Sequence, residues 1–434
     1  MKTSGPLFLG FRMLFGSRAG KKVKRHLIGA ILGVGFSLIP LILVIEVSGG
    51  MIEGITRRFI EIGSYHLQLK SYSDYDEEEI DGTLARIEEV EEVERAFEAV
   101  FGEGLVYSPT GRTGVSIRGL PEDFYERDGK VQEFLSFEEG SFDLSAGRNA
   151  LVSGEVARKL EVSVGDTVRL LTAKTMPGRS PVLRPSTFTV AGVFSTGYYE
   201  LDALSMYLHV EQGKRLFNTP SDRVIAVKTD DPYQNIEKTA GRIQSAMPPD
   251  WYVYTWYGME RAMLESFKTT RNLLIFIMII IVIVASFNIS SSMIMLVLEK
   301  EPEIAILKST GVHPKDIVYS FLSTGVFIGL TGMLIGITAG LALAVNINPL
   351  IDGLETVINT AAGAWGSLFD PEAGGFEGIT VFDENYYLEE IPIRLRFIEI
   401  FGAGVFTLLV TSAAAYFPAR RAGSIRPLDI LRKH

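Results

Sequence analysis

The sequence contains no cysteine and only five histidines in 434 residues. Without cysteine the chain forms no disulfide and offers no thiolate nucleophile and no Cys ligand for zinc. The histidines stand apart from one another, and none belongs to an HExxH or other paired metal spacing: His26, His66, His209, His313 and His434. No P-loop and no GxSxG nucleophile motif occurs either. We therefore expect no catalytic residue, no metal site and no cofactor on this chain.

Long apolar runs are absent from the large block 48–270, but four occur outside it, at 27–47, 273–298, 317–345 and 397–417. Each has roughly the 20 residues that a helix needs to cross about 30 Å of hydrocarbon. The sequence therefore predicts an integral membrane protein with four spans. The first run follows a long basic arm and precedes no small-x-small cleavage site, so we interpret it as a retained anchor rather than a cleaved signal peptide. Glu46, near its outer end, is expected to reach water at the interface.

Acidic residues are missing from the first 26 residues, which carry only positive charge: Lys2, Arg12, Arg18, Lys21, Lys22, Lys24 and Arg25. The segment after residue 417 is also basic, with Asp429 as its single acidic residue. Because Lys and Arg are enriched on the cytoplasmic flanks of spans, both termini are predicted to be cytoplasmic. The net charge of −10 then belongs to the segments outside. Basic residues beside a span indicate a topology anchor, and we expect no nucleic-acid partner.

The block 48–270 has the mixed pattern of an α+β domain. Alternating apolar residues favour strands at several places, among them a hairpin-like pair in 105–120. Helical spacing predicts a surface helix over 82–100 and another over 233–247. Three prolines predict a loop at 174–186. The segment 257–271 is expected to be helical and to lead directly into the second span.

A short amphipathic helix is predicted between the second and third spans. Pro302 and Glu303 suit its first turn, because proline loses no hydrogen bond there and a carboxylate favours the positive end of the helix dipole. Gly311 is expected to end it. Its apolar members are Ile304, Ile306 and Leu307. A helix of this kind, lying at the membrane surface between two spans, is where a transporter would contact the motor protein that drives it.

The predicted organisation, in chain order, is an amphipathic cytoplasmic arm at 1–26, the first span at 27–47, the exported α+β domain at 48–270, the second span at 271–298, the coupling-helix loop at 299–316, the third span at 317–345, an outer loop at 346–396, the fourth span at 397–417 and a basic cytoplasmic tail at 418–434.

Several stretches resemble one known family. FNISSSMIMLVLEKEPEIAILKSTG at 287–311 and YYLEEIPIRLRFIEI at 386–400 are similar to motifs of the LolC/LolE lipoprotein-releasing permeases, within the MacB-type ABC permease group. LVSGEVARKLEVSVGDTVRLL at 151–171, TFTVAGVFSTGYYELD at 187–202 and YFPARRAGSIRPLDILR at 416–432 resemble further family segments, so the likeness covers nearly the whole chain. Pro302 departs from the pattern, because the family more often has a basic or polar residue there.

The resemblance implies a fold, partners and a location. The fold would be MacB-like (type VII), with four transmembrane helices and a large periplasmic α+β domain, in the bacterial inner membrane. Two permease chains, identical or paralogous, would work with two copies of an ATPase subunit that binds ATP and Mg. The complex would extract lipoproteins from the membrane and pass them to a periplasmic chaperone.

The resemblance also implies roles for individual residues. Those expected to couple the chain to the ATPase are Glu303, Ile304, Ile306, Leu307 and Lys308. Those expected to line a cavity for the lipoprotein's acyl chains, between the first and second spans, are Val34, Phe36, Leu38, Leu41, Ile275, Ile279 and Val282. Those expected to form a hook for the chaperone are Met176, Pro177, Gly178 and Arg179.

Other functions share this four-span plan. A related class transmits ATPase motion to a periplasmic cell-wall hydrolase, and it would need no lipid-accessible cavity. MacB-type efflux pumps carry the ATPase on the same chain, and no ATPase motif occurs in this sequence. Within the family, a LolC-like role, a LolE-like role and a homodimer that serves both are equally compatible with the sequence.

Overall fold

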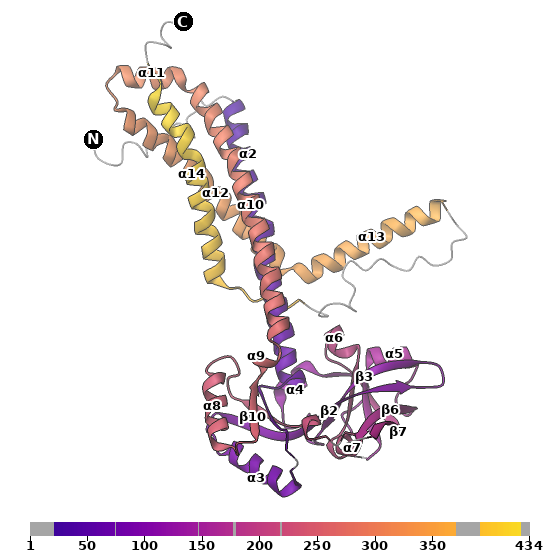
Figure 1. The fold of residues 1–434 in the computed structure, drawn as a ribbon. Helices are drawn as coiled ribbons and strands as arrows, with labels where there is room; N and C mark the ends of the chain where they lie inside the picture. The colour runs from indigo at the N-terminus through magenta and orange to yellow at the C-terminus, as the bar shows by residue number, and fades with distance from the viewer. Residues whose placement is uncertain are drawn as a thin grey trace. The chain divides into compact units, whose positions relative to one another are not determined.

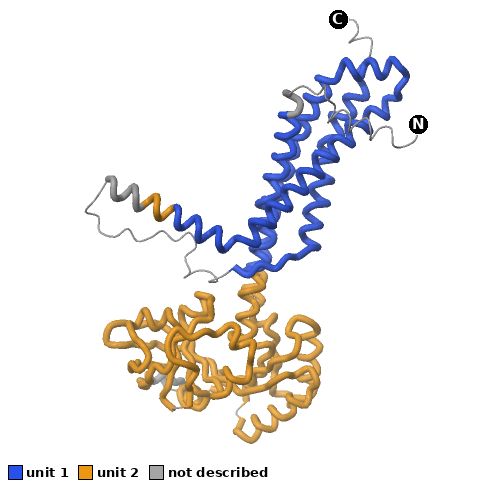
Figure 2. The backbone as a smooth tube through the Cα atoms, turned by 180° about the vertical axis from the view of Figure 1, so that it is seen from behind, with its two compact units in different colours: residues 1–51, 266–357, 391–434 blue, residues 52–265, 358–390 orange. Residues whose placement is uncertain are grey.

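The computed structural model describes residues 21–73, 75–145, 147–176, 179–217, 219–369 and 391–426. The chain divides into two compact units, which Figure 2 distinguishes by colour: unit 1 comprises residues 1–51, 266–357 and 391–434, and unit 2 comprises residues 52–265 and 358–390. Most of the predicted N-terminal arm, and the end of the basic tail, lie outside the described residues.

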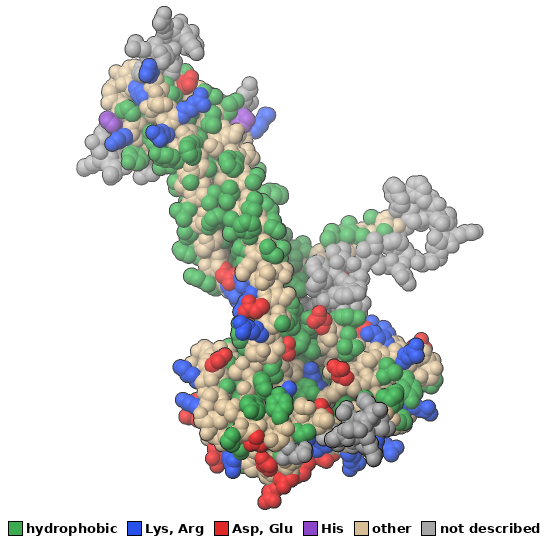
Figure 3. Space-filling view, viewed as in Figure 1, with side chains coloured by type: hydrophobic (Ala, Val, Ile, Leu, Met, Phe, Trp, Pro, Cys, Tyr) green, Lys and Arg blue, Asp and Glu red, His purple; other side chains and the backbone are tan. Residues whose placement is uncertain are grey.

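Among the described residues, four helices are long and apolar enough to cross a membrane: α2 (Lys21–Arg58), α10 (Arg261–Glu299), α12 (Pro314–Val345) and α14 (Phe397–Ser424). They confirm the predicted four spans. The short helix α11 (Glu301–Ser309) joins α10 to α12, and α13 (Ile347–Phe369) follows α12 (Figure 1). Hydrophobic side chains cover the sides of the long helices, while Lys and Arg gather at the end that carries α11 (Figure 3).

Small residues bring the spans of unit 1 into close contact. A Cβ atom added at Gly332 would lie 2.9 Å from the carbonyl oxygen of Ile31, and one added at Gly336 would lie 2.7 Å from that of Gly35. Glycines four residues apart on α12 therefore let its backbone approach α2, as small residues do in membrane helix pairs. On α12, Gly329 similarly faces Thr411 of α14.

In the part of unit 2 that the structure describes, the chain is built on one sheet of ten strands: β1 (Leu67–Ser71), β2 (Val93–Tyr107), β3 (Arg112–Leu120), β4 (Ser136–Gly140), β5 (Asn149–Ser153), β6 (Thr167–Met176), β7 (Arg179–Ser195), β8 (Ser205–His209), β9 (Arg223–Thr229) and β10 (Trp251–Thr255). The pairings β2–β3, β3–β8, β8–β5, β5–β7, β7–β6 and β6–β2 close a ring of six strands. Apolar side chains from all six strands, with α5 (Gly154–Leu160) and α7 (Val210–Leu216), fill one core.

The remaining sheet order, β10–β1–β9–β2, forms a second lobe. Its core joins side chains of these strands to those of α3 (Glu77–Glu88) and α8 (Ile236–Ala246), with Trp251 and Ile243 fully buried. The long strand β2 belongs to both lobes, since it pairs with β9 near its start and with β3 and β6 near its end. Unit 2 is thus the predicted mixed α+β domain.

The predicted helix over 82–100 is wrong in its second half. The helix α3 starts earlier, where Asp76 accepts a hydrogen bond from the Glu79 N–H, and it ends at Glu88. From Val93 the chain is strand β2. Its apolar residues fit a helical period, but pairing with β9 gives the extended backbone its hydrogen bonds and buries Phe97 and Val100. Tertiary pairing therefore overrides the local pattern.

Two predicted loops contain regular structure. The segment 174–186 is the end of a β6–β7 hairpin in which Thr172 pairs with Arg184 and Met176 with Arg179. Prolines do not prevent this, because a proline removes only one ladder donor and is tolerated where its nitrogen faces away from the partner strand. The outer segment 346–396 contains α13, which occupies its first half.

Candidate functional site

The candidate coupling element is α11, the predicted short helix between the second and third spans. Pro302 lies in its first turn, beside the acidic residues Glu301 and Glu303. After its last residue, Gly311 adopts φ +91°, and the Val312 N–H donates to the Leu307 carbonyl at 3.1 Å. This left-handed residue satisfies carbonyls that the helix end would leave open. The helix therefore starts and stops on local signals.

The apolar residues of α11 do not share one environment. Ile304 is fully buried in the core of unit 1, with residues such as Ile317 and Phe321 of α12, whereas Ile306 is 59% exposed. Two residues along a helix point about 200° apart, so both cannot face the same neighbour. The expectation that Ile304 contacts a partner is thus wrong for this structure. Ile306 remains available on the surface, and Leu307 is half-buried.

Lys308 is not free at the rim of α11. Its Nζ donates to the carbonyl oxygens of Gly423 and Ile425, each at 2.6 Å, at the end of α14. A lysine in this position suits the negative end of a helix dipole and satisfies carbonyls without an intrahelical partner. At the other end of α11, Lys300 pairs with Glu303 at 2.6 Å. The side chains of α11 therefore tie it to α14 and to its own entry turn.

The predicted cavity residues divide into two groups. Val34, Leu38, Leu41 and Val282 are buried inside the helix packing of unit 1, so they do not line an open surface of this chain. Phe36 is 75% exposed, and Ile275 and Ile279 are half-buried. Val34 and Leu38 are buried because the face of α2 that carries them packs against the glycines of α12.

A continuous exposed apolar stripe on α10 was missed by the sequence reasoning. Its members recur at helical spacing: Leu273, Phe276, Ile277, Ile280, Val284 and Phe287. On α2, Ile28 and Leu32 are exposed like Phe36. The signal was the opposite face, where the small residues Ser286 and Ser292 are buried. Small residues mark the packed side of a membrane helix. Large aliphatic residues on the opposite side therefore mark the surface that the helix leaves exposed.

A charged cluster in unit 1 was also missed. Arg271 of α10 forms an ion pair with Glu399 of α14, which also pairs with Arg396 at 3.2 Å. Glu46 of α2 accepts a hydrogen bond from the Arg396 N–H at 3.4 Å and is 2% exposed. The expectation that Glu46 reaches water is therefore wrong. The cluster links α2, α10 and the start of α14.

In unit 2, a buried polar cluster holds the end of the helix that begins as α2. A single π-turn, η1 (Phe59–Gly63), follows Arg58. Within it, Glu61 pairs with Lys228 of β9 at 2.9 Å and lies 3.4 Å from His66. Lys228 also pairs with Asp128. The two carboxylates and the neutralising ammonium thus fix η1 to the sheet.

Two of the four predicted hook residues lie where the strands β6 and β7 meet at the end of their hairpin. Met176 and Arg179 end the two strands. Pro177 and Gly178 lie outside the described residues. The hairpin gives the segment a defined base, with Leu183 61% exposed along it.

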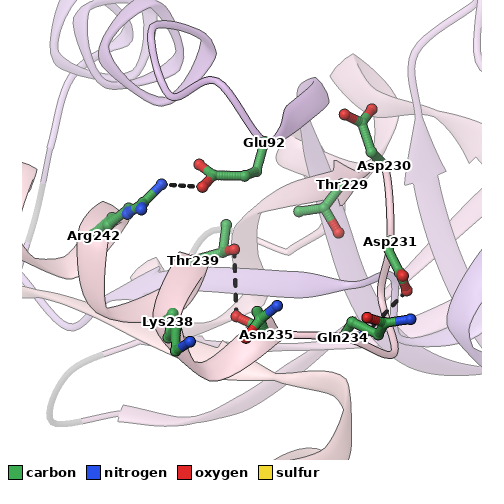
Figure 4. A pocket seen from close by; sticks show the side chains of 9 residues that line it. All are labelled: Glu92, Thr229, Asp230, Asp231, Gln234, Asn235, Lys238, Thr239 and Arg242. Atoms are coloured by element: carbon green, nitrogen blue, oxygen red, sulfur yellow. Dashed lines mark hydrogen bonds and ion pairs between the residues drawn. The ribbon is translucent and has the colours of Figure 1, made fainter.

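A polar cleft of about 340 Å³ lies in the second lobe (Figure 4). It is lined by Glu92, Thr229, Asp230, Asp231, Gln234, Asn235, Lys238, Thr239 and Arg242. Glu92 and Arg242 form an ion pair, and Asp231 accepts from the Gln234 N–H at 3.1 Å. Small-molecule sites are mostly apolar with a few convergent polar groups. This lining has the opposite balance and does not resemble such a site.

Comparisons with known proteins agree across the chain. Residues 27–246 match the MacB-like periplasmic core domain, and residues 275–427 match the FtsX-like permease C-terminal domain. The lipoprotein-releasing system transmembrane protein LolC of Neisseria meningitidis serogroup B is 25% identical, covering 93% of both chains. LolE of Haemophilus influenzae is 22% identical and covers 99% of both chains. LolC of Xylella fastidiosa is 25% identical over 68% of this chain and 67% of its own.

These matches extend over the domain and the spans described above, and they confirm the resemblance found in the motifs. They support an inner-membrane protein with a periplasmic domain, and the family implies an ATPase partner and a partner permease. Permease subunits of this kind lack a catalytic site of their own. The chain belongs to the LolC/LolE family of MacB-type ABC permeases.

Proposed function

We propose that this chain is the membrane permease subunit of an ABC complex that extracts lipoproteins from the inner membrane and passes them to a periplasmic chaperone. ATP hydrolysis on a separate subunit, present in two copies with ATP and Mg, drives the cycle. The observation that carries the proposal is α11, a fixed helix that presents Ile306 outward. The lipoprotein-releasing names of LolC and LolE support the choice of cargo.

The cytoplasmic ATPase would dock on the exposed side of α11, at Ile306, Leu307 and Glu303. Ile304 anchors α11 in the core of unit 1, and Lys308 fastens it to α14. A displacement of α11 is therefore passed to spans rather than absorbed by a loose loop. Both termini would be cytoplasmic, like α11, in keeping with their basic residues.

The acyl chains of the cargo would contact the exposed apolar surface of α2 and α10. Phe36 and Phe287 are 75% and 69% exposed and provide large apolar side chains. A second permease chain, identical or paralogous, would close the cavity around the acyl chains. Ile275 and Ile279 would lie at its edge, since they are half-buried in the chain itself.

The periplasmic chaperone would bind the tip of the β6–β7 hairpin, at residues 176–179. The segment 172–186 carries Lys174, Arg179 and Arg184 without an acidic residue, in a chain with net charge −10. A basic projection from an acidic protein gives a partner a defined electrostatic target.

Photocrosslinking in intact envelopes tests the proposal, with a photoreactive residue placed at Phe36 or at Gly178. Lipoprotein adducts at Phe36 that decline when ATP is supplied, and chaperone adducts at Gly178, are the expected result. Leu38 is the matched control, because it lies on the same helix and is fully buried. Adducts to a cell-wall hydrolase alone, with no lipoprotein at Phe36, would instead support mechanical signalling and would refute extraction.

A further inference from the structure

The helix α13 has a strongly one-sided sequence. At about 100° per residue, its apolar residues fall within a stripe roughly 120° wide, typical of a helix with one buried face. The members that precede residue 360 are Ile347, Leu350, Ile351, Leu354, Val357 and Ile358. The opposite side carries polar residues such as Asp352 and Thr356. No Lys or Arg occurs between Ile347 and Phe369.

Three of the six named stripe members are exposed, whereas Ile347, Ile351 and Ile358 are half-buried. Leu350, Leu354 and Val357 are 44%, 50% and 65% exposed. Val345, the last residue of α12, is 58% exposed and lies two residues before α13 begins. Exposed aliphatic residues on a span are in contact with lipid unless another chain covers them. The stripe therefore begins directly after the end of a membrane-spanning helix.

Connectivity places both ends of this segment at the ends of spans. α12 ends at Val345 and α13 begins at Ile347, so only one residue separates them. The Asn348 side chain donates to the Ile391 carbonyl at 3.4 Å and accepts from the Ile391 N–H at 3.2 Å. From Ile391 the chain leads to α14, which starts at Phe397. The first turn of α13 is thus fixed where one span ends and the next begins.

From these observations we infer that α13 is an interfacial helix that lies on the outer leaflet of the inner membrane, with its stripe among the acyl chains just below the headgroups. Amphipathic helices bind in this way with their apolar face about 5–10 Å into the headgroup boundary. The occupant of the stripe is lipid, because the stripe begins where a membrane-spanning helix ends and its first turn is held beside the start of the next span. Without Lys or Arg, binding relies on apolar burial rather than on anionic headgroups.

The inference does not depend on cargo, on the ATPase or on the chaperone. It concerns the way in which the outer segment between the third and fourth spans is held, and it would stand if the proposed transport function failed. An interfacial α13 also restrains the start of α14, through Asn348 and Ile391.

The absence of native cysteine makes the test direct. The full chain is purified with a single substitution, Leu354→Cys or Val357→Cys on the stripe, or Asp352→Cys or Thr356→Cys opposite to it. Each variant receives a nitroxide spin label and is placed in nanodiscs of neutral phospholipid. Its accessibility to oxygen, which concentrates in lipid, is compared with that to a water-soluble nickel chelate. The expected result is a severalfold preference for oxygen at 354 and 357 and the reverse at 352 and 356, unchanged between low and high salt.

Three outcomes would overturn the inference. Equal nickel accessibility at all four positions would mean that the helix stands in water. Labels at 354 and 357 that are shielded from both reagents, with spin–spin coupling that disappears on dilution with unlabelled chain, would assign the stripe to a second copy. Shielding from both reagents without such coupling would assign it to the chain's own structure. Normal elution and helical content of each variant identify a properly folded chain.

Discussion

Lys228 Nζ lies 2.9 Å from Glu61 Oε2, and the two side chains are 2% and 9% exposed. Glu61 belongs to the π-turn that ends the helix begun as α2, whereas Lys228 lies on β9. Single π-turns within helices are often found at functional sites. Here the turn places the Glu61 carboxylate beside the Lys228 ammonium and the His66 ring. Within unit 2, η1 is therefore held to β9 by a specific buried ion pair, in addition to apolar packing at Ile60 and Ile62.

The first prediction concerns this pair. Lys228→Met removes one partner and leaves the carboxylates of Glu61 and Asp128 buried without their cation. We expect a loss of about 3–5 kcal/mol in the free energy of unfolding of unit 2, the usual cost of breaking a buried pair. Denaturant unfolding of the full chain in detergent, followed by tryptophan fluorescence, measures it.

Lys130→Met is the matched control. Its partner Glu94 lies 3.6 Å away, and both side chains are exposed by 40% and 52%. Exposed pairs contribute about 0–1 kcal/mol, so this variant should unfold almost as the parent does. Equal losses in the two lysine variants would contradict a special role for the Glu61 cluster.

The sequence predicted what local signals determine. Four spans follow from apolar length, and the limits of α11 follow from Pro302 and Gly311. Which face of each helix is buried does not follow from local signals, because it depends on the neighbouring helix. Val34 and Phe36 are equally apolar in the sequence, yet one is 1% and the other 75% exposed.

Long-range partners were beyond the reach of sequence reasoning for the same reason. Glu61 and Lys228 are 167 residues apart, and Arg271 and Glu399 are 128 residues apart. Nothing local distinguishes these four from other charged residues. The spacing of Gly332, Gly336 and Gly340 was an available sign of close helix packing, and it would have indicated which face of α12 meets another helix.

The second prediction tests that packing. Gly336→Ala places a methyl group 2.7 Å from the Gly35 carbonyl oxygen, so α12 must move away from α2. Overpacking of this kind costs about 1–3 kcal/mol. A lower thermal unfolding midpoint of the detergent-solubilised chain is expected. Gly402→Ala on α14 is the control, since a Cβ there meets nothing within 4 Å, and an equal decrease in this variant would argue against close packing as the cause.

The third prediction concerns the charged cluster of unit 1. Arg271→Glu would place a third carboxylate beside Glu399 and Glu46, with Arg396 as the cation that remains nearby. Because Glu46 is buried and Arg271 and Glu399 are only partly exposed, we expect a loss of about 2 kcal/mol in stability and partial recovery in Arg271→Lys. Thermal unfolding compares these variants with Arg261→Glu, an exposed position on the same helix. Equal effects at positions 261 and 271 would show that the cluster has no such role.

The fourth prediction separates docking from anchoring on α11. Ile306→Asp changes an exposed side chain, so the permease should keep its thermal stability while its complex with the ATPase weakens at least about tenfold, roughly 1.4 kcal/mol. Ile304→Ala empties a fully buried site and should instead destabilise the chain by about 2–5 kcal/mol.

Lys308→Met leaves the carbonyls of Gly423 and Ile425 without their donor. If Lys308 transmits motion from α11 to α14, this variant binds the ATPase normally but loses most lipoprotein-stimulated ATP hydrolysis in proteoliposomes. Normal stimulation of ATP hydrolysis in Lys308→Met would show that the contact between Lys308 and the end of α14 is only structural. Normal complex formation with the ATPase in Ile306→Asp would place the docking surface elsewhere.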